Sequence, residues 1–298
     1  MKKILSISFL GLILFAGCKE KDPAVGLTSA LSTDSAWVMA SVPATDPHNV
    51  MIEEFSGQSC PNCPGGHATI ESNQALYPGR INAVVMYPYG SPDAIPPTGS
   101  AYNFEDSFAN NLSAYVTGGG IRGLPSTYID RVVYQGNNTQ EIDGTGTWPT
   151  DFGSQLLVTD SVNLAVQSSF NKTTTTATIT ATVIYTKPLS SKQNLSIVIV
   201  EDTIYNFQKI SSGAVDSSYL FTDVFRGMVS SIPAGDPILD TIAVKQAGQA
   251  YKRTYIYTLP ATSPAIVPKH CRVIAFINSV NGSDYHVMQS AQTSLTGL

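Results

Sequence analysis

The chain has little charge for its length. Lys, Arg, Asp and Glu make up 13% of its 298 residues, and the formal net charge is -5. A nucleic-acid binder needs an excess of Lys and Arg to neutralise phosphates, so we expect no nucleic-acid partner. The hydrophobic content of 43% lets the chain bury cores of ordinary size, which excludes disorder as its main state.

Long apolar runs are also scarce. The run near the N-terminus, from Ile4 to Ala16, follows two lysines and precedes the dipeptide "GC". It is too short to span a bilayer, but this layout is typical of a secretion signal. The sequence "LFAGC" resembles the bacterial lipobox, in which cleavage leaves a lipid-bearing cysteine as the first residue. This resemblance implies a signal peptide at 1–17, lipid attachment at Cys18 and a lipid bilayer as a partner.

Patterning divides the remainder into three parts. Residues 18–45 are polar, small and aperiodic, which is typical of a flexible tether. Residues 46–155 alternate apolar strand patterns with helix-compatible stretches, which predicts an α/β domain. In residues 156–298 the apolar residues recur with period two, as in "ATITATV", and several such short runs predict an all-β sandwich of immunoglobulin-like type.

Cysteine is rare, with four in the whole chain. If Cys18 carries lipid and Cys60 pairs with Cys63, Cys271 is left over. Because Cys271 opens a predicted strand, we expect its thiol to be buried and inert.

The segment Cys60-Pro-Asn-Cys63 follows an apolar strand and a turn and precedes a helix-compatible stretch. This order places the Cys60 thiol over a helix N-terminus, where the positive end of the helix dipole lowers a thiol pKa. Pro61 suits the first helical position. Cys63, one turn later, can attack a mixed disulfide at Cys60. The pattern predicts thiol–disulfide exchange, and it requires the sulfur of Cys60 to be accessible.

Other interpretations of the cysteine pair remain open. A structural disulfide that closes so short a loop would stabilise the fold by roughly 2 kcal/mol, against roughly 5 kcal/mol for a crosslink over two hundred residues. A zinc site lacks its second ligand pair, and His67 is the nearby candidate for a copper site completed by a histidine. A lone histidine on a helix is more often a surface or core residue. We therefore expect no cofactor and no metal.

Three features resemble thioredoxin-like proteins: the order of predicted elements, the sequence "GIRGLPSTYID", and a carboxylate at Glu54, six residues before Cys60. The resemblance implies that Pro125 is cis and faces the cysteine pair, and that Glu54 is buried and exchanges protons with Cys63. Alternatively, Glu54 lies at the solvent end of its strand. Ser59 replaces the tryptophan of the thioredoxin "WCGPC" motif, which leaves the redox direction open.

The sequences "SGQSCPNCPGGH", "GLPSTYIDR", "DVFRGMV" and "YHVMQSAQTSL" resemble the outer-membrane lipoprotein family of Bacteroidota named for a twenty-eight-kilodalton protein. The family implies a thioredoxin-like domain joined to a β-sandwich at the outer membrane, and no established substrate. Two functions follow. One is an oxidoreductase acting on exported proteins or a redox partner; the other is an adhesion or assembly module with a structural disulfide. We favour the oxidoreductase, because both thiols, Pro125 and Glu54 are present together.

Overall fold

The computed structural model describes residues 31–134 and 136–296, and its chain is predominantly β. In the first half the elements are β1 (Leu31–Val38), β2 (Val50–Phe55), α1 (Cys63–Leu76), β3 (Ile81–Pro88), β4 (Glu105–Asp106), α2 (Ser107–Thr117), β5 (Ser126–Ile129), β6 (Ile142–Asp143) and α3 (Trp148–Gln155). In the second half they are β7 (Val162–Asn171), β8 (Thr176–Tyr185), β9 (Lys192–Glu201), β10 (Ile204–Lys209), β11 (Val215–Phe221), β12 (Val224–Met228), β13 (Asp236–Ile238), β14 (Gln249–Thr258), a 3-10 turn (Pro268–His270), β15 (Cys271–Val280) and β16 (Val287–Ser294).

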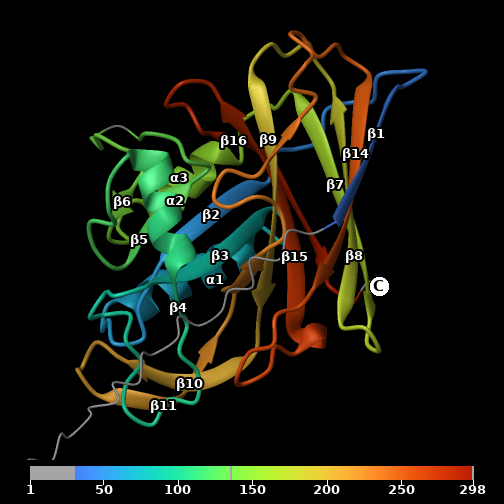
Figure 1. Ribbon diagram of the computed structural model, residues 1–298. Helices are drawn as coiled ribbons and strands as arrows, with labels where there is room; N and C mark the ends of the chain where they lie inside the picture. Colours follow the sequence, from blue (N-terminus) through green and yellow to red (C-terminus); the bar gives the residue numbers. More distant parts are fainter. Residues whose placement is uncertain (1–30, 135, 297–298) are drawn as a thin grey trace, which may run out of the picture.

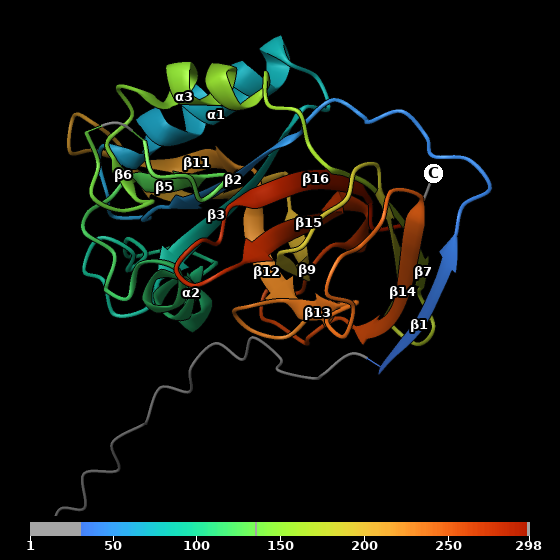
Figure 2. The ribbon, with the colours of Figure 1, turned by 90° about the horizontal axis from the view of Figure 1, so that it is seen from above.

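Strands β2 and β3 are parallel neighbours at the centre of the first half. Every residue of both strands is buried, which is typical of strands covered on both faces. Helices α1 and α3 lie on one face of the sheet and α2 on the other (Figure 2). Ile70 and Trp148 share a core with Ile52 on the first face, and Leu112 packs with Val84 on the second.

The sheet does not end where the predicted α/β domain ends. Strand β12 pairs with β3 and also with β9, so the hydrogen-bonded order is β16-β15-β9-β12-β3-β2-β5-β6. Strands from both sides of the predicted boundary near residue 155 therefore belong to one sheet. Pairing with β12 covers the edge of β3 that would otherwise present free backbone groups.

A second sheet, in the order β1-β14-β8-β7, packs against the β9, β15 and β16 part of the long sheet (Figure 1). Strand β8 alternates buried and less buried residues, as its period-two pattern predicts. Ile179 and Val183 from this strand meet Ile197 and Val273 in the core between the sheets.

Part of the segment predicted as a flexible tether, residues 18–45, is in fact strand β1. Residues 31–38 pair along their whole length with β14. The two carboxyl oxygens of Asp34 form a bidentate ion pair with Nε and Nη2 of Arg253, at 2.7 and 2.6 Å. The small polar residues that resemble a linker here form an edge strand, where exposure on both sides tolerates them. The predicted signal peptide 1–17, Cys18 and residues 19–30 lie outside the described residues.

The hairpin β10–β11 leaves the second half and lies at the ends of the first-half strands, near β4 (Figure 1). Its residues Ile204 and Phe221 share an apolar cluster with Val85 and Phe104. The backbone N–H of Lys209 donates to the carbonyl oxygen of Gln58 at 2.8 Å. The hairpin is thus packed onto the segment that precedes the cysteine pair.

Candidate functional site

Cys60 and Cys63 form a disulfide at the start of α1. The helix begins at Cys63, with Asn62 as its N-cap, rather than at Pro61 as predicted. The proline inside the first turn is Pro64, so the segment from Cys60 to Asn62 is a turn leading into the helix. Cys60 still precedes the helix N-terminus, where the dipole favours a thiolate once the disulfide is reduced.

Both cysteines are buried, and this contradicts the expectation that the sulfur of Cys60 is accessible. Cys60 is 2% exposed and Cys63 is fully buried. The β10–β11 hairpin lies against the backbone of this turn, where Nε2 of Gln208 donates to the carbonyl oxygens of Gly57 at 3.1 Å and Cys60 at 3.0 Å. The loop before β4 contacts the same turn, where the backbone N–H of Ser59 donates to the carbonyl oxygen of Asp93 at 2.8 Å. A client sulfur therefore reaches Cys60 only if the segments packed on this turn move.

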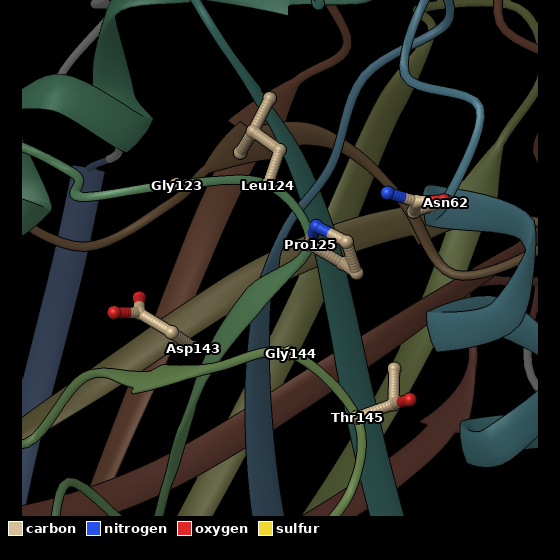
Figure 3. Close-up of a pocket in the computed structure, with 7 residues that line it drawn as sticks. All are labelled: Asn62, Gly123, Leu124, Pro125, Asp143, Gly144 and Thr145. Atoms are coloured by element: carbon tan, nitrogen blue, oxygen red, sulfur yellow. The ribbon is translucent and has the colours of Figure 1, made fainter.

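The peptide bond between Leu124 and Pro125 is cis, as the resemblance predicts. Figure 3 shows Pro125 lying between Asn62 of the cysteine turn and the loop that carries Gly144. A cavity of about 330 Å³ opens here. It is lined by Asn62, Gly123, Leu124, Pro125, Asp143, Gly144 and Thr145. A second cavity, of about 390 Å³, also borders Gly123 and Leu124, so open space flanks the residue before Pro125.

The structure separates the two neighbouring carboxylates of β2. Glu53 is paired with the buried guanidinium of Arg131 at 2.6 and 2.7 Å. Glu54 is fully buried, and neither of its carboxyl oxygens has a hydrogen-bond partner among the described residues. The solvent-end alternative for Glu54 is therefore wrong.

The Glu54 carboxyl lies beneath helix α1, one turn after Cys63. A Cβ atom built on Gly66 would be 2.5 Å from Oε1 of Glu54 and 3.3 Å from Cβ of Pro125. Burial raises the pKa of Glu54 well above its usual value, and the negative charges of Asp223 and Glu71 raise it further. The structure thus brings Glu54, Pro125 and the helix of Cys63 together.

His67, one turn beyond Cys63, connects the site to the hairpin. Its Nε2 lies 2.8 Å from Oγ of Ser56, and its Nδ1 lies 2.9 Å from Oη of Tyr219 on β11. Burial lowers the pKa of His67 to about 4, so its ring is neutral near pH 7. Within residues 31–134 and 136–296, no group of three His, Cys, Asp or Glu side chains is placed to hold a metal ion.

Gln208 and Tyr219 were not predicted as parts of the site. Gln208 is separated from Cys60 by 148 residues, and Tyr219 from His67 by 152. No local spacing could reveal contacts that depend on a hairpin from the other half of the chain.

Cys271 is a free, buried cysteine, which confirms the expectation of a buried thiol. Burial raises its pKa, and its Sγ donates to the carbonyl oxygen of Val267 at 3.4 Å. A protonated thiol in the sandwich core is a poor nucleophile.

Comparison with known proteins places the chain in a family. Residues 112–297 match the family model described as outer membrane protein Omp28. This chain belongs to the Omp28 family. The match confirms the family that the sequence motifs indicate, and the outer membrane is the protein's location. No helix in the part of the chain that the structure describes is long and apolar enough to cross a bilayer.

Among solved structures, HBP35 of Porphyromonas gingivalis is similar to this Omp28 family member with a TM-score of 0.58 and 18% identity, over 85% of this chain and 77% of that one. This likeness shows a shared fold. A domain of the outer membrane lipoprotein Omp28 from Porphyromonas gingivalis matches with a TM-score of 0.30 and 14% identity, over 45% of this chain and 95% of that one. None of the curated proteins matches the sequence.

Proposed function

We propose that this outer-membrane lipoprotein exchanges disulfides with exported proteins through Cys60 and Cys63, and that the β10–β11 hairpin covers the pair between reactions. The observation that carries the proposal is the carboxyl of Glu54, which is buried beside the cysteine helix and has no hydrogen-bond partner in the described part of the chain. An unpartnered buried polar group costs stability. A purely structural disulfide gives no reason to keep a buried, unpartnered carboxyl next to it. A role for Glu54 as the proton acceptor of Cys63 does give such a reason.

The arrangement of elements supports a thioredoxin-like unit at 46–155. Strand β2, helix α1, parallel strand β3, helix α2, and antiparallel strands β5 and β6 follow in the order that the resemblance implies. Residues 156–298, with β1 as an added edge strand, then supply an immunoglobulin-like sandwich that carries the covering hairpin. In this proposal, the hairpin carried by the sandwich determines when Cys60 can react.

The exchange balances without a cofactor. In the reduced protein, the Cys60 thiolate attacks a client disulfide, forms a mixed disulfide and displaces one client thiolate. The Glu54 carboxylate takes the proton of Cys63, and the Cys63 thiolate then attacks the sulfur of Cys60 and releases the second client thiolate. Two electrons pass to the client, and the Cys60–Cys63 disulfide is formed. The reverse sequence oxidises a client dithiol, and a redox partner resets the pair in either direction.

The cavities around Gly123 and Leu124 provide a place for the client. An extended segment laid along Leu124 would lie beside Asn62, and therefore beside the turn that carries Cys60. Such a segment gains backbone hydrogen bonds in the manner of an added strand. The hairpin must move away from Gly57 and Cys60 before the client sulfur can reach Cys60.

The burial of Cys60 favours a second candidate, a binding or assembly lipoprotein in which the disulfide is only structural. In that case the pair never reacts with a client in the native protein. The two candidates differ in one observable, the formation of a mixed disulfide.

The test is trapping in cells that make the full-length protein with Cys63→Ser. Exchange predicts that Cys60 of this variant accumulates in mixed disulfides with exported proteins, which a reducing gel step releases. The matched control is Cys60→Ser, which lacks the attacking sulfur and should trap none. Equal, background-level trapping by both variants would reject exchange and support the structural disulfide.

A further inference from the structure

Glu54 has no route to solvent of its own, because the side chain is fully buried. In the proposed exchange, formation of the Cys60–Cys63 disulfide leaves the proton of Cys63 on this carboxyl, and reduction of the disulfide by a redox partner returns it to Cys63. Exchange of that proton with bulk water needs, in addition, a group that connects Glu54 with solvent.

We propose that His67 and Tyr219 carry protons between the buried carboxyl of Glu54 and solvent, so that a hairpin residue completes the proton path of the cysteine site. This inference deepens the proposed exchange, and its use in turnover rests on that function. The three side chains come from β2, α1 and β11.

The geometry places the three groups in series. Nε2 of His67 is 3.8 Å from Oε1 of Glu54, beyond hydrogen-bond distance, and Nδ1 on the other side of the ring is 2.9 Å from Oη of Tyr219. The proposed path requires the Glu54 carboxyl to move toward the His67 ring and close this gap, while the ring keeps its contact with Tyr219. Tyr219 is half-buried whereas Glu54 and His67 are buried, so it is the outermost of the three groups.

A neutral imidazole suits this task, because it has one nitrogen that accepts a proton and another that donates one. The pKa of His67, lowered to about 4 by burial, keeps the ring in this neutral form near pH 7. The Glu54 proton is taken up at Nε2, and the Nδ1 proton passes to the Tyr219 oxygen as the Tyr219 hydroxyl releases its own proton to water. The carboxylate is regenerated, one proton has left, and the ring is now protonated at Nε2. A proton that enters from water by the same path restores the first tautomer and protonates Glu54 again.

Other titratable groups face this path. Glu71 of α1 and Asp223, which precedes β12, place negative charge near Glu54 and favour its protonated form. Tyr87 of β3 is a further neighbour, and burial raises its pKa, so it stays neutral near pH 7. None of these three is hydrogen-bonded to the His67 ring, whose partners are Ser56 and Tyr219.

The experiment measures how fast the Glu54 carboxyl exchanges its proton for deuterium in the full-length oxidised protein. Its infrared carbonyl band is identified as the band lost in Glu54→Gln, and the rate of its downshift is followed after transfer to D2O. We expect His67→Gln and Tyr219→Phe each to slow this exchange by about tenfold or more. Tyr219→Phe keeps the ring that packs against Phe221 at 4.8 Å between centroids, so it removes only the hydroxyl.

Tyr205→Phe is the matched control, because its hydroxyl is on the same hairpin but the side chain is 61% exposed. It should leave the rate unchanged. Equal rates in wild type, His67→Gln and Tyr219→Phe would overturn the path, as would the absence of any carboxyl band that Glu54→Gln removes. Neither result depends on a client: failed trapping by Cys63→Ser rejects exchange, whereas unchanged deuterium rates reject the path alone.

Discussion

The backbone of Gly66 lies directly against the carboxyl of Glu54. A Cβ atom on Gly66 would meet Oε1 of Glu54 at 2.5 Å, a separation that real Cβ atoms essentially never show. At the neighbouring Gly65, apart from its chain neighbours and the helix backbone, no atom of the described residues lies within 4 Å of the Cβ position. The helix of Cys63 therefore approaches the buried carboxyl closely at one residue and not at the next.

Substitution of these two glycines should have opposite effects on stability. Gly65→Ala should raise the free energy of unfolding by about 0.5–1 kcal/mol, because alanine loses less conformational entropy in a helix. Gly66→Ala should lower it by about 1–3 kcal/mol, because the added methyl group displaces Glu54 or the helix. Urea denaturation of both variants checks this. Equal stabilisation by both would show that Glu54 does not lie against α1.

Glu54→Gln should stabilise the protein at alkaline pH. The pKa of Glu54 is raised in the folded state, so its contribution to stability is full below about 4.5, the unfolded value, and is lost as pH rises through the folded pKa. Glutamine does not ionise and escapes this loss. The stability of Glu54→Gln minus that of wild type should therefore grow between pH 5 and pH 9. A constant difference would mean that Glu54 is not buried in an unpaired state.

Glu53→Gln provides the matched comparison. Its carboxylate is paired with the buried Arg131, so the substitution leaves a buried guanidinium without its counter-charge. We expect a loss of about 3–5 kcal/mol near pH 7. Denaturant unfolding should then show that the free energy of unfolding falls in Glu53→Gln but rises in Glu54→Gln at alkaline pH.

His48 should make stability fall at mildly alkaline pH. Its Nδ1 is 2.7 Å from Asp160 and its Nε2 is 2.8 Å from Asp130. Burial lowers its pKa, but the hydrogen bonds to both carboxylates outweigh burial and raise the pKa to about 10. The stabilisation is thus full below the unfolded value of about 6.5 and is lost as pH rises toward about 10.

The test compares wild type with His48→Gln. The variant should be less stable by about 3–5 kcal/mol at pH 6, because two carboxylates lose their charged partner. The difference should shrink steadily between pH 6.5 and pH 10. His286→Gln, at a histidine whose side chain is 41% exposed, is the control and should change stability little. A difference that stays constant over this range would contradict a charged His48.

Local patterns were sufficient for the centre of the first half. The apolar runs of β2 and β3 predict buried strands, and the cysteine pair falls at the start of a helix, as its flanking residues indicate. The cis bond before Pro125 was predicted by resemblance rather than by composition, since few X-Pro bonds are cis. Short-range periodicity determines each of these elements, so the sequence alone indicates them.

Long-range pairing was not predicted. Residues 31–38 have the small polar composition of a linker, and only their pairing with β14 makes them a strand. The sheet that joins the two halves depends on β12, a five-residue strand whose neighbour β3 is far away in the sequence. The same holds for the contact of the hairpin with the cysteine turn, and for the burial of Cys60, whose thiol was expected to be accessible.

The different environments of Glu53 and Glu54 also could not be predicted from the local sequence. Both glutamates lie in one buried strand, and period two places them on opposite faces without showing which face holds a partner. Only the structure shows Arg131 beside Glu53 and no hydrogen-bond partner among the described residues for Glu54. The resemblance indicated Glu54 by its position six residues before Cys60, and the structure shows that its neighbour Glu53 is paired with Arg131 instead.

The most direct test of a covered but reactive cysteine pair is the rate at which dithiothreitol reduces the Cys60–Cys63 disulfide in the native protein, with and without Gln208→Ala. This substitution removes the hydrogen bonds from the hairpin to Gly57 and Cys60. Each hydrogen bond contributes about 1 kcal/mol, so the hairpin should open more often and reduction should become about five- to thirtyfold faster. Gln140→Ala, at a loop glutamine that contacts Ser283, is the control and should leave the rate unchanged. Reduction that proceeds only at the rate of global unfolding, equally in all three proteins, would contradict the account and leave the disulfide a structural one.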